Sequence, residues 1–266
     1  MKNRLLNLIF LLTLTGCATY SSFIDQSSKY LFSEDEEVRL GSQVFSETRA
    51  SMSQQGVPRN ANPAQVRKIQ NMVNRIAAVS DNPHLPYEVD IYSTPVVNAM
   101  AAPGGKIIVF EGLWDPKNGL AKSDDEIAAV LAHEIAHVNC RHSAKAMTSN
   151  MLLGGSLAVA SAVAKSRENN TAALALGGAF IAYEGLLVTH YSRRDEYEAD
   201  RVGMMYMAKA GYDPRAAVRI WERAAAGGGN SGSPLDMLST HPNDANRMQA
   251  LRQQLPAAME IYKKQR

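Results

Sequence analysis

The spacing of hydrophobic and polar residues divides the chain into helices and one short set of strands. Hydrophobic side chains recur at helical spacing over about residues 63–80, which predicts a helix there, and a capping signal at Ser33 predicts another helix over about residues 33–55. The first helix begins at a capping-box sequence, S-E-D-E, and the second follows a loop rich in Gly, Pro and Asn. Residues 87–93 alternate between hydrophobic and polar instead, which predicts a half-buried strand.

A hairpin and further helices are predicted after this strand. A P-G-G turn separates residues 98–102 from residues 106–111, an arrangement that predicts a β-hairpin. A second capping-box sequence, S-D-D-E, begins a helix at Ser123. Later helices are expected over about residues 191–210 and 214–226 and at the C-terminus.

Two more hydrophobic stretches, residues 151–164 and 172–188, are rich in Gly and Ala. A comfortable membrane span needs about 20 residues. Both stretches are shorter and the second contains Glu184, so we interpret them as helices packed on the domain. Contact with a membrane surface stays open. Because the chain has no internal repeat and no clear linker, we expect one α+β domain over residues 33–266, mainly helical with a small sheet.

Composition and charge exclude one class of partner. The 266 residues are 45% hydrophobic and 20% charged, and the formal net charge is +2. Neither a basic stripe nor a basic tail is present in the sequence. We therefore expect no nucleic-acid partner.

The N-terminal residues predict export and attachment of lipid. Lys2 and Arg4 precede the hydrophobic run LLNLIFLLTL, which has the length of a secretory signal core rather than of a membrane span. The sequence L-T-G-C that ends at Cys17 resembles the processing site of bacterial lipoproteins. That resemblance implies a signal peptide over residues 1–16, lipid on Cys17 and a tether over residues 17–32.

The same resemblance bears on location and on disulfides. Ala18 follows the cysteine, which by analogy with lipoprotein sorting implies the outer membrane, with the protein facing the periplasm. Several acyl chains on one residue give stable membrane anchoring. If Cys17 carries lipid, Cys140 is the remaining cysteine and no internal disulfide forms.

The sequence H-E-x-x-H over residues 133–137 lies within a mostly hydrophobic predicted helix. His133 and His137 are one turn apart, so both imidazoles project from one side of the helix and can bind one ion. Glu134 lies about 100° round the helix from His133, where it can reach a metal-bound water without binding the metal. Zn²⁺ lowers the pKa of such a water, and a carboxylate accepts its proton. The alternative, two polar residues that share a helix face, would be costly to bury.

A catalytic zinc ion usually has three protein ligands, so a third ligand is required. Cys140 and Ser143 stand where the metzincin pattern has Gly and His, which excludes that family. His142 follows His137 by five residues and is expected to face elsewhere. Cys140 is expected to be a small buried residue.

Glu196 is the better candidate for the third ligand. It shares one face of a predicted helix with Asp200, Gly203 and Met207. A glutamate followed one turn later by an aspartate matches a division of roles in which the glutamate binds zinc and the aspartate holds the free N–H of a histidine ligand. Gly203 would allow a close approach to the H-E-x-x-H helix. We therefore expect a zincin domain of the gluzincin type.

These motifs together resemble a known family. The order H-E-x-x-H, Gly/Ala-rich insert and E-x-x-A-D is similar to the metallopeptidase family of HtpX and the CAAX prenyl endopeptidases (metallopeptidase family forty-eight), in particular to its periplasmic lipoproteins. The resemblance runs from Asn98 to Arg247 and includes N-A-M-A-A-P-G-G-K-I-I-V and T-H-P-N-D-A-N-R. It implies a zinc-dependent endopeptidase that hydrolyses unfolded or misassembled envelope proteins, with the outer-membrane assembly machinery as a further partner.

The resemblance also gives roles to two residues near the C-terminus. It implies that His241 approaches the active site, where the imidazole either stabilises the oxyanion or temporarily fills the open position on zinc. It implies further that Arg247 holds the loop of His241. From the residues alone, a histidine beside a proline after a Gly-rich loop is equally consistent with a surface position.

A predicted strand offers a way to bind substrate. The segment at residues 106–111 precedes the zinc-motif helix, and a free edge there would bind a peptide through its backbone. The alternative is a hairpin that completes the sheet. The candidate substrate-binding residues are Asn98, Lys106, Ile107, Ile108 and Val109.

Two other functions remain open. A chaperone or assembly factor for outer-membrane proteins would use the same groove with little proteolysis. A structural zinc site would need a fourth permanent ligand, and His241 or Cys140 would have to supply it.

Overall fold

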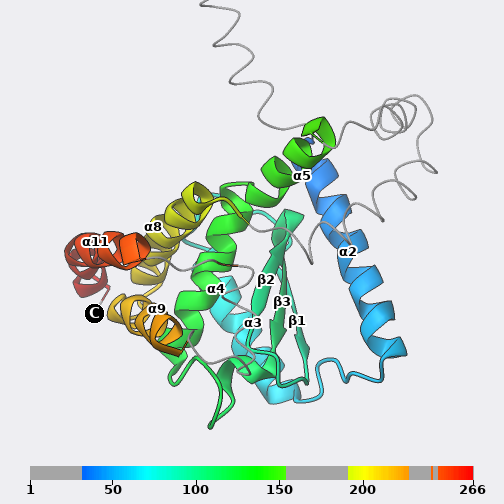
Figure 1. Cartoon of the computed structure of the whole chain (residues 1–266), viewed down its shortest axis with the longest axis horizontal. Helices are drawn as coiled ribbons and strands as arrows, with labels where there is room; N and C mark the ends of the chain where they lie inside the picture. The colour runs from blue at the N-terminus through cyan, green and yellow to red at the C-terminus, as the bar shows by residue number, and fades with distance from the viewer. Residues whose placement is uncertain (1–31, 154–190, 228–240, 242–244, 266) are drawn as a thin grey trace, which may run out of the picture.

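A computed structural model of the protein describes residues 32–153, 191–227, 241 and 245–265. In these residues the chain forms a mainly helical α+β domain with one three-stranded sheet. Figure 1 shows the sheet between α2 on one side and α4, α8, α9 and α11 on the other, while α5 extends toward one end of α2. The helices are α2 (Glu34–Gln54), α3 (Pro63–Ala77), α4 (Asp124–Asn139), α5 (His142–Leu153), α8 (Arg193–Lys209), α9 (Arg215–Gly227) and α11 (Ala245–Lys263).

Helices α2, α3 and α4 begin where the sequence predicts, whereas α5 was not predicted to begin at His142. Ser33 and Glu36 form the reciprocal capping box at the start of α2. The side chain of Asn62 caps α3, which ends at Ala77, three residues before the predicted end. Ser123 caps α4, but the carboxylate of Glu126 turns away from it and bonds the N–H of Lys122 and the guanidinium of Arg223 instead. Only half of the expected capping box therefore forms at α4.

The sheet consists of β1 (Glu88–Tyr92), β2 (Ala99–Ala102) and β3 (Lys106–Phe110) in the order β1-β3-β2. The predicted hairpin is confirmed, because β2 and β3 pair antiparallel around a turn in which Gly104 has φ 66°. The prediction of a free edge at residues 106–111 is wrong. Strand β3 is central, since it also pairs in parallel with β1, and its backbone is not available to a peptide.

The edge strand of the predicted hairpin is β2 instead. In this antiparallel pair, every second residue of β2 hydrogen-bonds β3 through its backbone. Ala99 and Ala101 are the residues between, so their N–H and C=O groups point away from β3. The side chains assigned to substrate in β3 are also inside the fold: Ile107, Ile108 and Val109 are buried, and the Nζ of Lys106 bonds Pro86 and Glu88.

Strand β1 is buried on both faces, which corrects the prediction of a half-buried strand. Helix α2 covers the face that the alternation assigned to solvent (Figure 1). Asp90 on that face is buried and accepts hydrogen bonds from Arg49 and Arg59. A paired carboxylate can be buried at an acceptable cost, so polar residues there do not indicate exposure.

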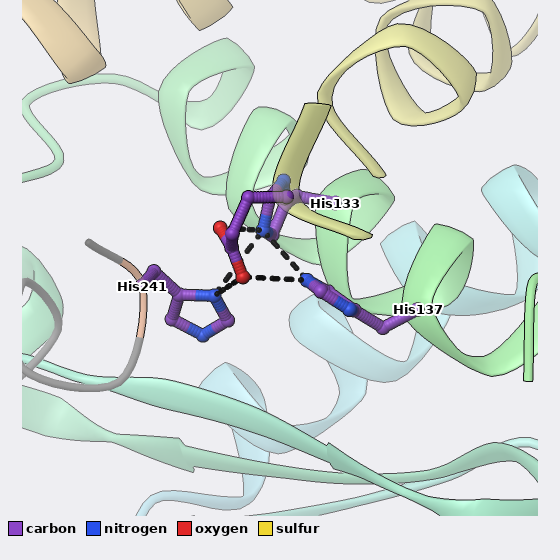
Figure 2. A group of neighbouring side chains, drawn as sticks. His133, His137 and His241 are labelled. Atoms are coloured by element: carbon purple, nitrogen blue, oxygen red, sulfur yellow. Dashed lines mark hydrogen bonds and ion pairs between the residues drawn. The ribbon is translucent and has the colours of Figure 1, made fainter. Parts of the chain in front are cut away.

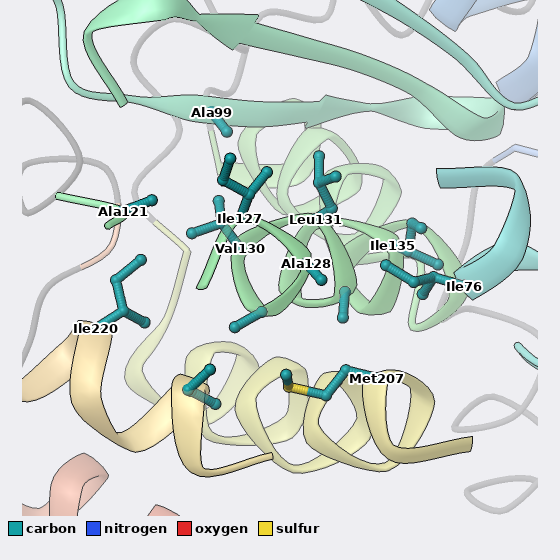
Figure 3. Close-up of a cluster of buried hydrophobic side chains, with 14 of the residues drawn as sticks. Ile76, Ala99, Ala121, Ile127, Ala128, Val130, Leu131, Ile135, Met207 and Ile220 are labelled. Atoms are coloured by element: carbon teal, nitrogen blue, oxygen red, sulfur yellow. The ribbon is translucent and has the colours of Figure 1, made fainter. Parts of the chain in front are cut away.

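Helix α4 lies at the centre of the fold. Every residue from Glu126 to Val138 is buried, and α3, α8, α9 and β2 all pack against the helix. Figure 3 shows Leu131 directed toward the sheet, and Ile76 of α3 and Met207 of α8 on other sides of α4. The helix that carries the H-E-x-x-H sequence is thus held from all sides.

Helices α4 and α8 approach closely at Gly203, as the sequence predicts. A Cβ atom on Gly203 would lie 2.9 Å from the carbonyl oxygen of Ala132 and 2.9 Å from the backbone nitrogen of His133. Real Cβ atoms do not come so close, so glycine is required for this helix separation.

Several predictions lie outside the described residues. These are the signal peptide, the lipidated Cys17, nearly all of the tether, and the Gly/Ala-rich stretches beyond residue 153. Within the described part of the chain, no helix is long and apolar enough to cross a membrane.

Candidate active site

His133 and His137 lie one turn apart on α4 and are both buried. Their Nε2 atoms are 2.9 Å apart, so the two imidazoles point at one place (Figure 2). Burial lowers the pKa of His137 well below its ordinary value, which favours the neutral imidazole that binds metals. The spacing of the motif therefore produces the paired nitrogens that the sequence predicts.

Glu196 approaches the pair from α8. Its two carboxylate oxygens lie 3.4 Å from the Nε2 atoms of His133 and His137, one oxygen to each ring. Although burial opposes ionisation, the nearby His241, His133 and His137 hold the pKa of the Glu196 carboxyl well below its ordinary value. The residue predicted as the third ligand is thus buried, ionised and within reach.

His241 completes the group. Its Nδ1 lies 3.0 Å from Oε1 of Glu196 and 3.3 Å from Nε2 of His133 (Figure 2). The imidazole is buried, which excludes the alternative of a surface position, and it lies in the site as the family resemblance implies. Among the described residues, these four side chains form one group whose donor atoms all lie within 4.8 Å of one another.

The donor set fits a zinc ion. Tetrahedral zinc ligands at about 2.0–2.1 Å lie about 3.3–3.4 Å from each other. The donor atoms of His133 lie 2.9 to 3.4 Å from those of His137, Glu196 and His241, and the Glu196 carboxylate lies 3.4 Å from His137. Within the described residues, neither carboxylate oxygen of Glu134 makes a hydrogen bond of normal geometry. Buried carboxylate oxygens without donors are costly, and a cation with its bound water would satisfy them.

Asp200 and Arg247 hold this group from behind. Asp200 Oδ1 lies 3.0 Å from Nδ1 of His133, as predicted for a carboxylate that orients a ligand histidine. Burial opposes protonation of His133, but the bonds to Asp200 and Glu196 outweigh it and raise its pKa to about 9. The pocket therefore favours positive charge at its centre.

Arg247 connects three parts of the site. Its Nε and a terminal nitrogen bond the two oxygens of Asp200 at 2.8 and 2.9 Å, and its other terminal nitrogen lies 2.8 Å from Glu196. The same group reaches the carbonyl of His241 at 3.4 Å. The guanidinium also stacks on Trp221 at 4.7 Å. Arg247 thus bonds the backbone of His241, a contact consistent with the role that the resemblance implies.

Glu134 lies beside the group without joining it. Its Oε1 is 3.4 Å from Nε2 of His241, and it is fully buried. Burial raises the pKa of the Glu134 carboxyl above its ordinary value, against the opposing effect of His241 and His133. A carboxylate of raised pKa beside a metal site is a suitable proton acceptor.

Two residues beside His137 were not predicted as functional. His142 is expected from the sequence to face elsewhere, yet its Nδ1 lies 2.8 Å from Nδ1 of His137. Tyr191 stacks on the His137 ring with centroids 3.9 Å apart, and its hydroxyl lies 2.9 Å from Oγ of Ser143. Cys140 ends α4 and is partly buried, and burial raises the pKa of its thiol to about 11.

Residues 63–255 match the family model described as "Peptidase family M48". The chain belongs to peptidase family M48. Its membership makes it a metallopeptidase, and the M48 peptidases depend on zinc, for which the buried His/Glu group is suited.

Relatives of this M48 chain come from mitochondria and from bacteria. The mitochondrial metalloendopeptidase OMA1 of Schizosaccharomyces pombe is 32% identical over 90% of this chain and 68% of its own length. The OMA1 of Arabidopsis thaliana is 36% identical over 70% of this chain and 36% of its own length. The beta-barrel assembly-enhancing protease of Yersinia pestis is 28% identical over 85% of this chain and 45% of its own length. The M48 chain thus spans less than half of the last two relatives.

Proposed function

We propose that the protein is an endopeptidase in which His133, His137 and Glu196 hold zinc and Glu134 is the general base. The observation that carries this proposal is the convergence of these side chains from α4 and α8 on one buried point. A structural zinc site would use four permanent ligands. His241 could be the fourth, but a structural site gives no reason for the buried Glu134 beside it.

In this proposal, the metal, Glu134 and Asp200 have separate roles in peptide hydrolysis. Zinc, when bound, supplies a polarised carbonyl and a water of lowered pKa. Glu134 accepts a proton from the attacking water and delivers it to the leaving amine. Asp200 holds Nδ1 of His133, so Nε2 of that ring stays directed at the metal position.

We propose that substrates pair with the edge of β2. The backbone groups of Ala99 and Ala101 that point away from β3 support this, because β-augmentation binds extended chains with little dependence on their side chains. A substrate paired there would replace the bond from the Ala99 N–H to Asn98 and the bond from Ser143 to the Ala101 carbonyl. Strand β2 also packs on α4 directly, so a chain paired there would pass beside Glu134. An extended segment is what an unfolded protein offers, which favours unfolded or misassembled proteins as substrates. Asn98 precedes this edge and its side chain accepts a hydrogen bond from the N–H of Ala99.

We propose a bacterial envelope location with a lipid anchor on Cys17. The basic residues, short hydrophobic run and L-T-G-C sequence support secretion and lipidation, and Ala18 supports the outer membrane facing the periplasm. The similarity to bacterial proteins named beta-barrel assembly-enhancing proteases supports envelope proteins as substrates. Labelled palmitate should enter the wild-type protein and not Cys17→Ser. An absence of label in the wild type would overturn the anchor.

A second candidate is assistance to outer-membrane protein assembly without cleavage. Two observations favour it: the names of the bacterial relatives, and His241, which fills the space between Glu134 and the ligand group. Cells that carry Glu134→Gln distinguish the two. If cells with Glu134→Gln show the same envelope defect as cells without the protein, the function requires peptidase activity. If these cells have a normal envelope, the function is assembly alone.

The proposed chemistry is tested on a disordered protein substrate. The purified chain should cleave it, a chelator should abolish cleavage, and added zinc should restore it. Glu134→Gln should keep stoichiometric zinc and lose activity. Cleavage that survives in Glu134→Gln would contradict the assigned base.

A further inference from the structure

We propose that His142 is a positioning residue that fixes His137 through its outer nitrogen, in a relay that ends at Glu198 and Asp195. Nδ1 of His142 lies 2.8 Å from Nδ1 of His137, and the rings meet edge to face with centroids 4.9 Å apart. His142 is fully buried. The inference rests on the proposed function in one respect, namely that His137 binds zinc.

The proton positions follow from the chemistry of imidazole. If His137 binds zinc through Nε2, its proton is on Nδ1 and needs an acceptor. The Nδ1 lone pair of His142 is that acceptor. His142 then carries its own proton on Nε2, which lies 3.4 Å from Oε2 of Glu198 and 3.5 Å from Oδ1 of Asp195. Each donor in the relay therefore faces an acceptor.

The carboxylates at the outer end are balanced by a cation. Nζ of Lys145 lies 3.7 Å from Oδ1 of Asp195 and 3.6 Å from Oε2 of Glu198. Both carboxylates are on the first turns of α8, the helix that also carries Glu196. The relay therefore joins His137 to the helix of the third ligand, as Asp200 does for His133.

The chain turns sharply to bring His142 to this position. Had α4 continued, His142 would face about 140° away from His137. Instead α4 ends at Asn139, and Arg141 adopts the left-handed conformation with φ 57°. That conformation is costly for a residue with a side chain. The guanidinium of Arg141 is held by Glu37 of α2 and by the carbonyl of Phe32, which fixes the turn.

Groups that hold the free nitrogen of a ligand histidine typically contribute tenfold to a hundredfold in metal affinity. His142→Phe keeps a planar ring and removes the acceptor, so zinc affinity should fall by about tenfold to a hundredfold. His142→Asn restores a carbonyl oxygen near the position of Nδ1 and should recover most of the loss. Met147→Leu, a buried change on the same helix away from His137, should leave zinc affinity unchanged.

The experiment measures zinc dissociation constants by competition with a chelator, in the Glu134→Gln background so that self-cleavage does not interfere. The unfolding temperature of each variant is recorded with zinc and with chelator. A positioning role reduces the rise in unfolding temperature that zinc produces, whereas a purely structural role lowers both temperatures equally.

Three results would overturn the inference. The first is a zinc affinity of His142→Phe equal to that of the Glu134→Gln parent, and the second is an equal loss of zinc affinity in His142→Phe and His142→Asn. The third is a rise in unfolding temperature on adding zinc that is undiminished in His142→Phe. If His142→Phe does not fold, Glu198→Gln takes its place. It should weaken zinc binding by a smaller factor, because Asp195 remains, and an unchanged zinc affinity would overturn the relay. Failure of the parent to bind zinc, or full zinc in His137→Ala, would reject the proposed function itself.

Discussion

Nε2 of His241 lies 3.4 Å from Oε1 of Glu134, while Nδ1 of the same ring lies 3.0 Å from Oε1 of Glu196. The imidazole therefore stands between the proposed base and the ligand group, where water and the scissile carbonyl must enter. We predict that His241→Ala raises basal cleavage or self-cleavage, because the entrance opens and three ligands remain. Cleavage of a disordered substrate, with zinc content measured in parallel, tests this.

The alternative role of His241 predicts the opposite change in the cleavage rate of His241→Ala. If the imidazole stabilises the oxyanion, its removal should lower turnover about a hundredfold or more. His84→Ala is the control, because His84 is an exposed histidine paired with Glu34 and should have no effect. Unchanged turnover in His241→Ala would remove both roles.

Arg247 compensates two buried carboxylates, Glu196 and Asp200. Breaking a buried ion pair by removing one partner typically costs about 3–5 kcal/mol. We therefore predict that Arg247→Leu lowers the free energy of unfolding by about that amount in the presence of chelator. Arg252→Leu on the same helix is the matched control, since its pair with Glu222 is exposed and worth about 1 kcal/mol or less. Equal losses in the two variants would contradict this account of Arg247.

Gly203→Ala tests the helix contact that brings Glu196 to the histidines. The added methyl would lie 2.9 Å from backbone atoms of α4, so the helices must separate. We expect a loss of about 1–3 kcal/mol in unfolding free energy, together with weaker zinc binding. Arg201→Ala, an exposed change on α8, should affect neither. Retention of wild-type zinc affinity in Gly203→Ala would show that the site tolerates a wider separation.

Glu126 should make the stability of the protein depend on pH. Burial raises its pKa, but hydrogen bonds from Arg223 and the Lys122 N–H outweigh burial and lower it below the ordinary 4.5. A group with a lowered folded-state pKa stabilises the protein above its unfolded-state pKa, and the contribution is lost as pH falls through the folded-state value.

The corresponding measurement is the difference in unfolding free energy between wild type and Glu126→Gln, in chelator. We predict about 1–3 kcal/mol at pH 7 and a difference that shrinks as pH falls below 4.5. Asp124→Asn, whose pair with Lys68 is exposed, serves as the control. A difference independent of pH would contradict the ion-pair account.

Local patterns were sufficient for α2, α3, α4, α8 and α9 and for the core of the site, but not for α5. The spacing of His133, His137, Glu196 and Asp200 follows directly from the helical repeat, and the structure brings these residues together. The sequence L-T-G-C at Cys17 stays a prediction, because that segment lies outside the described residues.

Long-range pairing was not predictable in the same way. The order β1-β3-β2 depends on a parallel pairing between β1 and β3 that no local pattern specifies, so the free edge was assigned to the wrong strand. His142 was misplaced because the left-handed Arg141 interrupts the helix. Its stabilising contact comes from Glu37, more than a hundred residues away in the sequence. Tyr191 is part of no motif and is recognised only by its stacking on His137.

The most direct test of the central claim combines zinc content with cleavage in Glu196→Ala and Glu134→Gln. Glu196 lies 3.4 Å from both ligand histidines, whereas Glu134 is not part of the donor group and lies 3.4 Å from His241. Our account predicts that both variants lose cleavage, and that Glu196→Ala also loses zinc while Glu134→Gln keeps one ion per chain. Full zinc occupancy in Glu196→Ala, or active cleavage by Glu134→Gln, would contradict it.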